Sequence, residues 1–337
     1  MTGSETPMMD CGLCVEPGTF VLQSRPLPET APEGWALVDI AAIGICGTDY
    51  HIFEGKHPFL AYPRVIGHEL SGHIAGGPDA GRLVVINPYL SCGKCRACRR
   101  GKPNCCAAIE VLGVHRDGGM CARIAVPKGN LYFADGLEPR QAAMVEFLAI
   151  GAHAVARSET GKGDVVLVTG AGPIGIGTAL FARLAGAKVH LLDRSRKRLD
   201  LVRDLFGFSD VHLVGDEDLL TGAAAEGFDV VFDATGNARA IESGFPLVAH
   251  GGSTVLVSVV KDDIRFTDSE FHKREMRIIG SRNALKADFE AVMAAIRGGD
   301  IPTEAIASET VTLADLPLRF PQLVEDREAV VKVLVTP

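Results

Sequence analysis

A glycine-rich segment between an expected strand and an expected helix constrains the fold of this chain more than any other feature. The segment Gly-Ala-Gly-Pro-Ile-Gly at 170–175 follows the apolar run 164–169 and precedes a helical pattern that extends to about residue 185. Such glycines allow a tight turn and a close approach of the backbone to a pyrophosphate, which then faces a helix N-terminus. A dinucleotide is the expected ligand, and its expected contacts are Gly170, Gly172, Pro173, Ile174 and Gly175.

Asp193 ends the next expected strand, at 188–193, and follows Gly175 by 18 residues. A carboxylate there accepts hydrogen bonds from the adenosine ribose hydroxyls and repels a 2'-phosphate, so the sequence favours NAD over NADP. Arg194 and Arg198 keep NADP as the alternative, because a nearby guanidinium accommodates the extra phosphate.

The remaining pattern predicts two domains, since 337 residues are too many for one ordinary core. Buried-strand patterns at 229–234, 253–259 and 277–281 continue a parallel α/β sheet. Residues 8–135 instead show short apolar runs between Gly, Pro and Asp, which indicates an irregular β domain. Two late β-like runs, at 311–313 and 330–335, come too late to extend the nucleotide sheet, and we expect them to rejoin the first domain.

Composition excludes several classes of function. Hydrophobic residues make up 47% of the chain and charged residues 23%, which is typical of a folded globular protein. The formal charge of -8, with one short basic run at 194–198, argues against a nucleic-acid partner. The first residues lack a secretion signal, and no apolar run is long enough to cross a membrane. We therefore expect a cytoplasmic protein without membrane partners.

Five of the nine cysteines lie between residues 92 and 106. Cys92, Cys95, Cys98 and Cys106 are separated by two, two and seven residues, so one loop can place four thiolates around a tetrahedral zinc ion. A site closed by four protein ligands has no open position for substrate, so this zinc is expected to be structural. Cys105 competes with Cys106 for the fourth place, and spacing does not decide between them. Cys11 and Cys14 lie in an apparent strand and are interpreted as packing residues.

A second candidate metal site combines Cys46 with His68 and Glu69. Cys46 lies in the segment Gly-Ile-Cys-Gly-Thr-Asp-Tyr-His at 44–51, and Gly67 precedes His68 and Glu69. Three protein ligands of this kind make an open zinc site that leaves room for substrate. The spacing alone is weak, because lone thiols and His-Glu pairs often serve packing and surface contacts.

Together, Gly-Ile-Cys-Gly-Thr-Asp-x-His, Gly-His-Glu, the four-cysteine lobe and Gly-Ala-Gly-Pro-Ile-Gly resemble the zinc-containing medium-chain dehydrogenases. The resemblance covers essentially the whole chain. It points to the polyol and sugar-acid branch, with sorbitol, threonine and L-galactonate 5-dehydrogenases, the last through Phe-His-Lys at 271–273 and Gly-Ser-Arg-Asn at 280–283. It implies a GroES-like β domain, 1–154 and 285–337, with a zinc lobe at about 90–108. This domain is interrupted by a Rossmann domain at 155–284.

The resemblance also assigns the metal ligands. Cys46 and His68 match catalytic zinc ligands, Glu69 matches the adjacent carboxylate, and Cys106 matches the fourth structural cysteine, giving two zinc ions per chain. Glu146 matches a further ligand, bound directly or through water, so Glu69 and Glu146 compete for one place. Relatives follow this glutamate with proline, whereas this chain has Phe147. A second departure is Met-Cys-Ala-Arg at 120–123, where relatives have an aromatic and an acidic residue.

By the same resemblance the protein oxidises a secondary alcohol to a ketone. The Thr48 hydroxyl would accept the alcohol proton, His51 would pass it outward with the nicotinamide ribose, and Asp49 would orient His68. The alternatives are a structural hydrogen bond for His51 and a backbone-bonded turn hydroxyl for Thr48. Zinc would lower the pKa of the alcohol, and NAD would accept the hydride.

A polyol or an aldonate is the expected substrate. Arg282, His115 and Lys273 are candidate cationic contacts for it, with cofactor-phosphate binding by Arg282 as an equal alternative. Other functions remain open: a simple alcohol or threonine dehydrogenase, a dinucleotide-binding sensor without turnover, and a zinc-free quinone or enoyl reductase. Relatives form homodimers or homotetramers by joining edge strands, and 253–259 is a candidate edge.

Overall fold

The chain divides into two units in the computed structural model, which describes residues 6–57, 60–215, 219 and 221–337. The first unit consists of Met1–Glu146, Met293–Gly299 and Ile306–Pro337, and the second of Phe147–Val292 and Asp300–Ala305. Three of the unit boundaries fall inside helices, namely α4 (Val145–Ser158), α9 (Lys286–Arg297) and α10 (Thr303–Ile306). Compactness alone does not test where folding domains end, so the expected boundaries after residues 154 and 284 stay predictions.

The first unit is built almost entirely of short strands. Its strands are β1 (Met8–Glu16), β2 (Thr19–Pro26), β3 (Trp35–Ile45), β4 (Arg64–Val65), β5 (Glu69–Ile74), β6 (Leu83–Ile86), β7 (Tyr89–Leu90), β8 (Glu110–Val111), β9 (Arg123–Pro127), β10 (Leu131–Phe133), β17 (Ala307–Thr312) and β18 (Lys332–Thr336). Its helices are α1 (Gly47–Phe53), α2 (Arg96–Arg99), α3 (Pro139–Ala143) and α11 (Leu316–Glu325), with 3₁₀ turns at Pro103–Cys105 and Lys128–Asn130. This is the irregular β domain that the sequence predicts.

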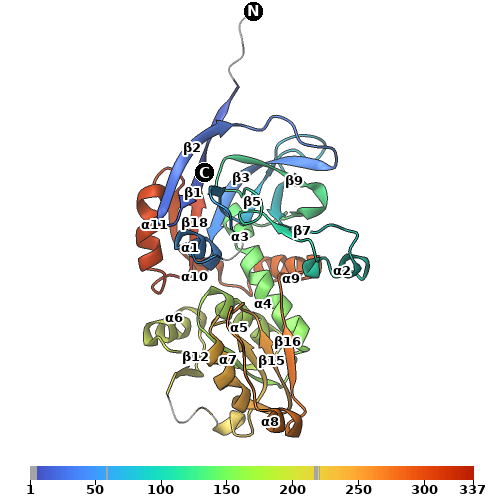
Figure 1. The fold of residues 1–337 in the computed structure, drawn as a ribbon, viewed down its shortest axis with the longest axis vertical. Helices are drawn as coiled ribbons and strands as arrows, with labels where there is room; N and C mark the ends of the chain where they lie inside the picture. The colour runs from blue at the N-terminus through green and yellow to red at the C-terminus, as the bar shows by residue number, and fades with distance from the viewer. Residues whose placement is uncertain (1–5, 58–59, 216–218, 220) are drawn as a thin grey trace, which may run out of the picture. The chain divides into compact units, whose positions relative to one another are not determined.

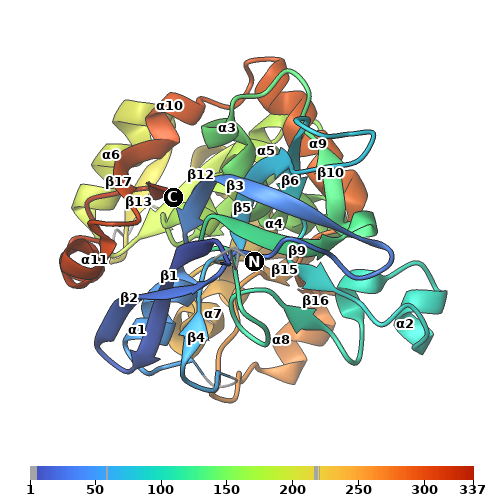
Figure 2. The ribbon, with the colours of Figure 1, turned by 90° about the horizontal axis from the view of Figure 1, so that it is seen from above.

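A seven-stranded sheet forms the centre of this unit, in the order β10-β6-β5-β3-β18-β17 with β9 also paired to β3 (Figure 2). Strand β18 pairs antiparallel with β3, where Leu334 lies opposite Gly44. The late β runs therefore rejoin the first unit, as predicted. Buried Val38, Ile43, Leu70 and Ile86 contribute to the core beside this sheet. The sheet places the end of β3 and the start of β5 side by side, and the candidate ligands follow from these two points.

The second unit is an α/β unit around one six-stranded sheet. Its strands are β11 (Val165–Thr169), β12 (Lys188–Asp193), β13 (Val211–Leu213), β14 (Phe228–Asp233), β15 (Val248–Leu256) and β16 (Arg277–Gly280). The helices are α4 (Val145–Ser158), α5 (Pro173–Leu184), α6 (Arg196–Phe206), α7 (Ala238–Gly244), α8 (Asp268–Lys273), α9 (Lys286–Arg297) and α10 (Thr303–Ile306), with 3₁₀ turns at Gly222–Ala224 and Phe245–Leu247. Of these helices, α4 begins and α9 ends in residues of the first unit, and Ile306 of α10 also belongs to it.

All strand pairs of this sheet are parallel, in the order β13-β12-β11-β14-β15-β16. Strands β12, β15 and β16 are labelled in Figure 1. The order reverses between β11 and β14, which is the switch point where such sheets bind nucleotides. Buried Leu167, Phe228, Val231 and Ile241 belong to the core of this unit. The fold is thus a GroES-like β unit combined with a Rossmann sheet, as the sequence predicts.

The expectation that 253–259 forms an edge of this sheet is wrong. The strand there is β15, which ends at Leu256 and lies between β14 and β16, so the edges are β13 and β16. The misassignment has a physical reason: periodicity identifies strands, including the expected one at 277–281, but not their neighbours. Only the pairing of β16 outside β15 makes β16 the edge. Among the described residues, none of the helices has the length and apolar character needed to cross a membrane.

Candidate metal centres and nucleotide loop

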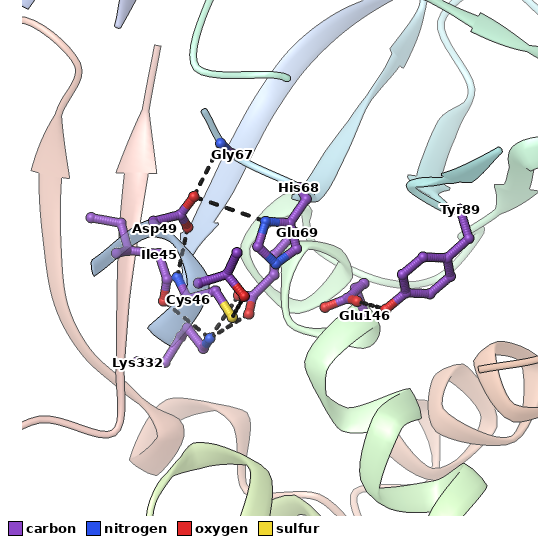
Figure 3. A network of polar contacts seen from close by, with 10 residues as sticks. Ile45, Cys46, Asp49, Gly67, His68, Glu69, Tyr89, Glu146 and Lys332 are labelled. Atoms are coloured by element: carbon purple, nitrogen blue, oxygen red, sulfur yellow. Dashed lines mark hydrogen bonds and ion pairs between the residues drawn. The ribbon is translucent and has the colours of Figure 1, made fainter. Parts of the chain in front are cut away.

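Cys46 begins the candidate open metal site at the point where β3 ends and α1 begins. It is the N-cap of α1, and its backbone N–H donates to Asp49 Oδ2 at 2.9 Å. The other carboxylate oxygen, Asp49 Oδ1, accepts the backbone N–H of Gly67 at 3.3 Å. Fully buried Asp49 therefore ties the loop that carries Cys46 to the loop that carries His68 (Figure 3).

His68 precedes β5 and is almost completely buried, with 6% of its surface exposed. Its Nδ1 atom lies 3.9 Å from Asp49 Oδ1 and has no hydrogen-bond partner among the described residues. Burial disfavours protonation of this imidazole. The negative charge of Cys46, with Asp49 and Glu146, outweighs burial and raises the pKa of His68 well above its usual value. The surroundings of His68 thus favour positive charge.

The donor set fits a zinc ion. One donor atom each of Cys46, His68 and Glu69 lies within 4.8 Å of the others, which brings sulfur, nitrogen and oxygen donors together. These are ligand types that zinc accepts, and three of them leave a fourth tetrahedral position open. The anionic groups around His68 add the electrostatic condition that a cation would satisfy. The structure brings these three residues together, as the sequence analysis expects. Their roles as ligands stay predictions.

Lys332 on β18 is a member of this site that the sequence analysis missed. Its ammonium donates to both carboxylate oxygens of Glu69 at 2.7 Å and to the carbonyl of Ile45 at 3.1 Å (Figure 3). Burial disfavours the ammonium, but the Glu69 carboxylate outweighs it and raises the pKa of Lys332. Both side chains are essentially inaccessible, with exposures of 1% and 0%. A lysine in a late strand carries no local motif, so only the pairing of β18 with β3 could reveal it.

A close approach of the backbone completes the surroundings of Glu69. Gly44 lies opposite Glu69 in the β3–β5 pair, and a Cβ at Gly44 would overlap the Glu69 carboxylate. Glycine at position 44 is therefore required for this position of the carboxylate.

Glu146 has a different partner. Its carboxylate accepts the hydroxyl of buried Tyr89, toward which it points in Figure 3. Burial raises the pKa of Glu146 to about 7 and raises that of Tyr89 well above its usual value. Among the described residues, Glu146 does not belong to the group of donors that lie within 4.8 Å of one another. Ligation by Glu146 stays a prediction, and Tyr89 is a second residue that the sequence did not single out.

Thr48 and His51 both lie on α1, three residues apart and hence on one face of the helix. Thr48 is half-buried, and its Oγ1 atom is 3.8 Å from the Cys46 sulfur. His51 is exposed. The two side chains therefore mark a direction along α1 from the metal site toward solvent.

The four-cysteine lobe brings together the four predicted sulfurs. Those of Cys92, Cys95, Cys98 and Cys106 lie within 4.8 Å of one another, at 3.5 Å for Cys95–Cys98 and 3.9 Å for Cys95–Cys106. Zinc–sulfur bonds of about 2.3 Å in a tetrahedron place sulfurs about 3.8 Å apart, so the spacing suits the ion. Cys105 is exposed and lies outside the group, which decides the competition in favour of Cys106. Backbone N–H groups of Cys98 and Ala107 lower the pKa of Cys95 to about 6.

The glycine loop of the second unit joins β11 to α5. Gly170 has a φ of 95°, which only glycine adopts readily, and Gly172 is the N-cap of α5. A Cβ at Gly175 would overlap the carbonyl oxygen of Gly170, so the loop can close tightly only with glycine there. Pro173 occupies the first turn of α5, where a missing N–H is tolerated.

Asp193 ends β12 beside this loop, as expected. Its Oδ2 accepts the backbone N–H of Ala171 at 2.7 Å, and its Oδ1 accepts that of Ser195 at 2.7 Å. Asp193 thus connects the glycine loop to the start of α6. The sequence assigns it to ribose; the structure adds a role in shaping the loop.

The cationic side chains predicted to contact cofactor or substrate differ in their burial and in their local partners. Arg198 on α6 is buried, while Arg194 and Arg282 are exposed. The His115 Nδ1 atom accepts the backbone N–H of Val111, and Lys273 lies 3.8 Å from Glu270 on α8. His115 and Lys273 therefore both have local partners, and substrate contacts by these residues remain predictions.

Comparisons with known proteins agree with this architecture. A family model described as the alcohol dehydrogenase GroES-like domain matches residues 32–135, and one described as zinc-binding dehydrogenase matches residues 173–297. The chain is 37% identical to an L-galactonate-5-dehydrogenase of Escherichia coli K12, over 97% of this chain and 99% of that protein. It is 29% identical to a sorbitol dehydrogenase of Halalkalibacterium halodurans, over 95% of this chain and 96% of the relative.

The fold is also similar to that of an alcohol dehydrogenase from Escherichia coli CFT073 that was solved with its cofactor NADH. The TM-score is 0.90 at 28% sequence identity, and the match covers 98% of this chain and 99% of that structure.

Proposed function

This chain belongs to the zinc-containing alcohol dehydrogenase family, and on that premise we propose that it oxidises a secondary alcohol of a polyol or aldonate to a ketone with NAD. The observation that carries the proposal is the group formed by Cys46, His68 and Glu69, which offers three zinc donors and one open position. The full-length similarity to an L-galactonate-5-dehydrogenase supports the class of substrate.

A zinc ion bound at this group would supply a Lewis acid that lowers the pKa of an alcohol. The chain's own residues would hold the donors in place. Asp49 fixes the backbone on both sides of the site through Cys46 and Gly67, and Lys332 neutralises the charge of Glu69. Cys46 and His68 are the two fixed donors of the proposal, and Glu69 and Glu146 compete for the remaining place.

The alcohol proton would leave along α1. The Thr48 hydroxyl lies close to the Cys46 sulfur, so it could accept a proton from an alcohol bound in the open position of the metal site. His51 lies one turn further along the same face and is exposed, so its imidazole would release the proton to solvent.

The hydride would pass to a nicotinamide held by the second unit. Gly170, Gly172 and Gly175 leave space for the pyrophosphate at the start of α5, and the Asp193 carboxylate favours a ribose without a 2'-phosphate. These features support NAD as the cofactor. Arg194 and Arg198 are the groups through which NADP would compete.

A substrate panel with zinc analysis on the same sample tests the proposal. Purified protein is assayed for reduction of NAD and of NADP with aldonates, sugar alcohols, threonine and simple primary alcohols. We expect NAD reduction with an aldonate or polyol and two zinc ions per chain. Turnover of primary alcohols without turnover of aldonates or polyols would overturn the substrate class.

Two further outcomes separate this proposal from the other classes. A dinucleotide-binding sensor would bind NAD and zinc but reduce no cofactor with any alcohol. A zinc-free reductase would contain no zinc. A Cys46→Ala variant should lose activity and one zinc while it keeps the zinc of the four-cysteine lobe.

We also propose a cytoplasmic location and a homodimer or homotetramer. The nine cysteines are all free, and five of them, the four of the lobe and Cys46, need to stay reduced to bind zinc, which suits a reducing compartment.

A further inference from the structure

Cys11 and Cys121 form a pair of buried thiols that the proposed dehydrogenase reaction does not use. Cys11 lies in β1 and Cys121 in the segment before β9, and each residue is 2% exposed. The two residues are partners in an isolated antiparallel bridge. Their side chains therefore lie on the same side of the two backbones.

The hydrogen bonds around the bridge define its type. The N–H of Gly12 donates to the carbonyl of Met120 at 2.7 Å, so the bonds flank the cysteines and do not join them. In such a non-hydrogen-bonded pair the Cα atoms are about 4.5 Å apart. A disulfide requires Cα atoms about 4.4–6.8 Å apart, and the usual separation in a bridge of this type lies within that range.

The surroundings make the two sulfurs unequal. A hydrogen bond from the Cys121 thiol, followed by the charge of Arg25, lowers the pKa of Cys11, although burial and Asp117 oppose this. The same hydrogen bond and burial raise the pKa of Cys121. Arg25 is held beside the pair by its salt bridge to Asp117 at 2.9 Å. Cys11 is thus the sulfur that loses its proton more readily, and Cys121 is the thiol that faces it.

We propose that Cys11 and Cys121 are a redox site that closes a reversible disulfide in response to hydroperoxides. The Cys11 thiolate attacks one oxygen of hydrogen peroxide, the O–O bond breaks, and hydroxide leaves and takes up a proton to become water. The Cys121 sulfur then attacks the sulfur of the Cys11 sulfenic acid. The S–O bond breaks, and a second water leaves with the Cys121 proton. Two thiols are oxidised by two electrons, and one peroxide is reduced to two water molecules.

The disulfide would join β1 to a segment that supports the loop of the candidate metal site. Gly118, Gly119 and Met120 donate backbone hydrogen bonds to Val65, Gly67 and Ile66, respectively, at 2.7–3.0 Å. His68 follows directly after these acceptors. Closing the bond would therefore fix the backbone that leads into His68, and we expect it to stabilise the first unit against unfolding.

Peptide mapping of the zinc-loaded protein tests the inference. The protein is treated with hydrogen peroxide, free thiols are alkylated, and the chain is digested without reduction and analysed by mass spectrometry. We expect a cross-link between the peptide that contains Cys11 and the tryptic peptide 117–123, lower in mass by two hydrogen atoms and removed by a thiol reductant. The oxidised protein should also melt several degrees higher than the reduced protein.

Variants assign the cross-link. Cys14→Ser is the matched control, because Cys14 is buried in the same strand and shares the digestion fragment of Cys11; this variant should still form the cross-link. Cys121→Ser should form none, should show no rise in melting temperature, and should accumulate a Cys11 sulfenic acid that dimedone traps. Cys105→Ser, which changes an exposed thiol, should behave like the unmutated protein.

The inference is overturned if the unmutated protein, folded and with its zinc retained, shows both thiols fully alkylated after peroxide treatment. Loss of the cross-link in Cys14→Ser would also overturn it, because Cys14 would then be the partner of Cys121. Each result can be read without any measurement of dehydrogenase activity, so failure of this inference and failure of the proposed function are distinguishable.

Discussion

Single side chains decide how charge is balanced in the candidate metal site. The Glu69 carboxylate is already engaged by the Lys332 ammonium through both oxygens, whereas the Glu146 carboxylate has the Tyr89 hydroxyl. A carboxylate paired in this way can bind a metal only by sharing its oxygens with the ammonium. The competition between the two glutamates is thus between a carboxylate paired with an ammonium and one hydrogen-bonded to a phenol hydroxyl.

Removing the Lys332 ammonium tests how the charge of Glu69 is balanced. In Lys332→Met the Glu69 carboxylate stays buried without a counter-charge, and we expect the metal-free protein to lose about 3–5 kcal/mol of stability. Zinc should restore part of the loss, because the ion supplies the missing positive charge. Melting temperatures with and without zinc measure both effects. The double variant Lys332→Met/Glu69→Gln is the control and should be more stable than the single variant without metal; equal instability would contradict the role of the pair.

Asp193 should determine which dinucleotide binds. Replacing it by alanine removes the repulsion of a 2'-phosphate and also one anchor of the Ala171 and Ser195 backbone. We expect Asp193→Ala to weaken NAD binding by roughly 10-fold, the loss of about 1.4 kcal/mol, and to narrow the preference over NADP. Titration calorimetry with both cofactors measures this. Asp193→Asn, which keeps one acceptor for the loop, separates loss of the loop anchor from loss of charge.

His190 in β12 should make the second unit sensitive to acid. Its Nδ1 atom lies 3.0 Å from Nε2 of His212, and burial lowers the pKa of His190. Below the ordinary histidine pKa the unfolded chain binds a proton that the folded chain does not. The contribution of His190 to the free energy of unfolding is therefore fully present above about pH 6.5. It falls as the pH is lowered through that value, by at most about 1.4 kcal/mol per pH unit.

Urea unfolding of the unmutated protein and of His190→Gln, at pH 8 and pH 5, checks this sign. The variant has no proton to gain at this position, so its stability should fall less between the two pH values. An equal fall in both proteins would assign the acid sensitivity to other groups.

At the scale of elements, the four-cysteine lobe is held by little besides its own cysteines. It contains one helix of four residues, α2, with no buried residue, and a 3₁₀ turn at Pro103–Cys105. Bound metal can supply the order that such a segment cannot obtain from an apolar core. The helices and strands of the second unit, by contrast, pack on a core of their own.

Cys98→Ser should therefore release one zinc and loosen the lobe without unfolding the second unit. We expect hydrogen exchange to increase over residues 92–106 and to stay unchanged over β11 and β14. Mass spectrometry of exchanged peptides, with zinc content measured alongside, gives the readout. Cys105→Ser is the matched control, and an equal zinc loss there would show that the neighbouring cysteine is the ligand instead.

At the scale of the whole molecule, the edge strands of the second unit are the places where copies could add sheet to sheet. β16 carries Ile278, which is 37% exposed, and the opposite edge is β13. An exposed apolar side chain on an unpaired edge favours pairing with another strand.

We expect Ile278→Asp to lower the oligomeric state, because a charge would have to be buried in the joined edge. Light scattering after size-exclusion chromatography measures the mass. Val214→Asp, at an exposed position just beyond β13, is the matched control and should leave the mass unchanged. If only the control variant dissociates, the contact lies at β13.

Much of this protein could be predicted from its sequence because the relevant signals are local. The glycine loop, Asp193 and the strand–helix alternation are constrained by backbone geometry within one βαβ unit, so residues 164–193 predict their own structure. The four-cysteine lobe is equally local, since one loop carries all its ligands. Cys46 and His68 are proposed as ligands of the catalytic zinc through a family resemblance, because such a cysteine and histidine are common in packed cores and their spacing alone is weak evidence.

Tertiary structure decided what depends on segments far apart in the chain. Lys332 meets Glu69 only because β18 pairs with β3, and Tyr89 meets Glu146 only because a strand and a helix converge. Spacing left Cys105 and Cys106 in competition, and the structure places the Cys106 sulfur with the other three, in agreement with the resemblance. The pairing of β16 decided which strand forms the sheet edge. Periodicity and spacing report neighbours along the chain, whereas a buried charge or thiol depends on partners that only folding brings near. The sequence by itself thus determined the fold class and the candidate ligands, and the tertiary structure decided how their charges are balanced.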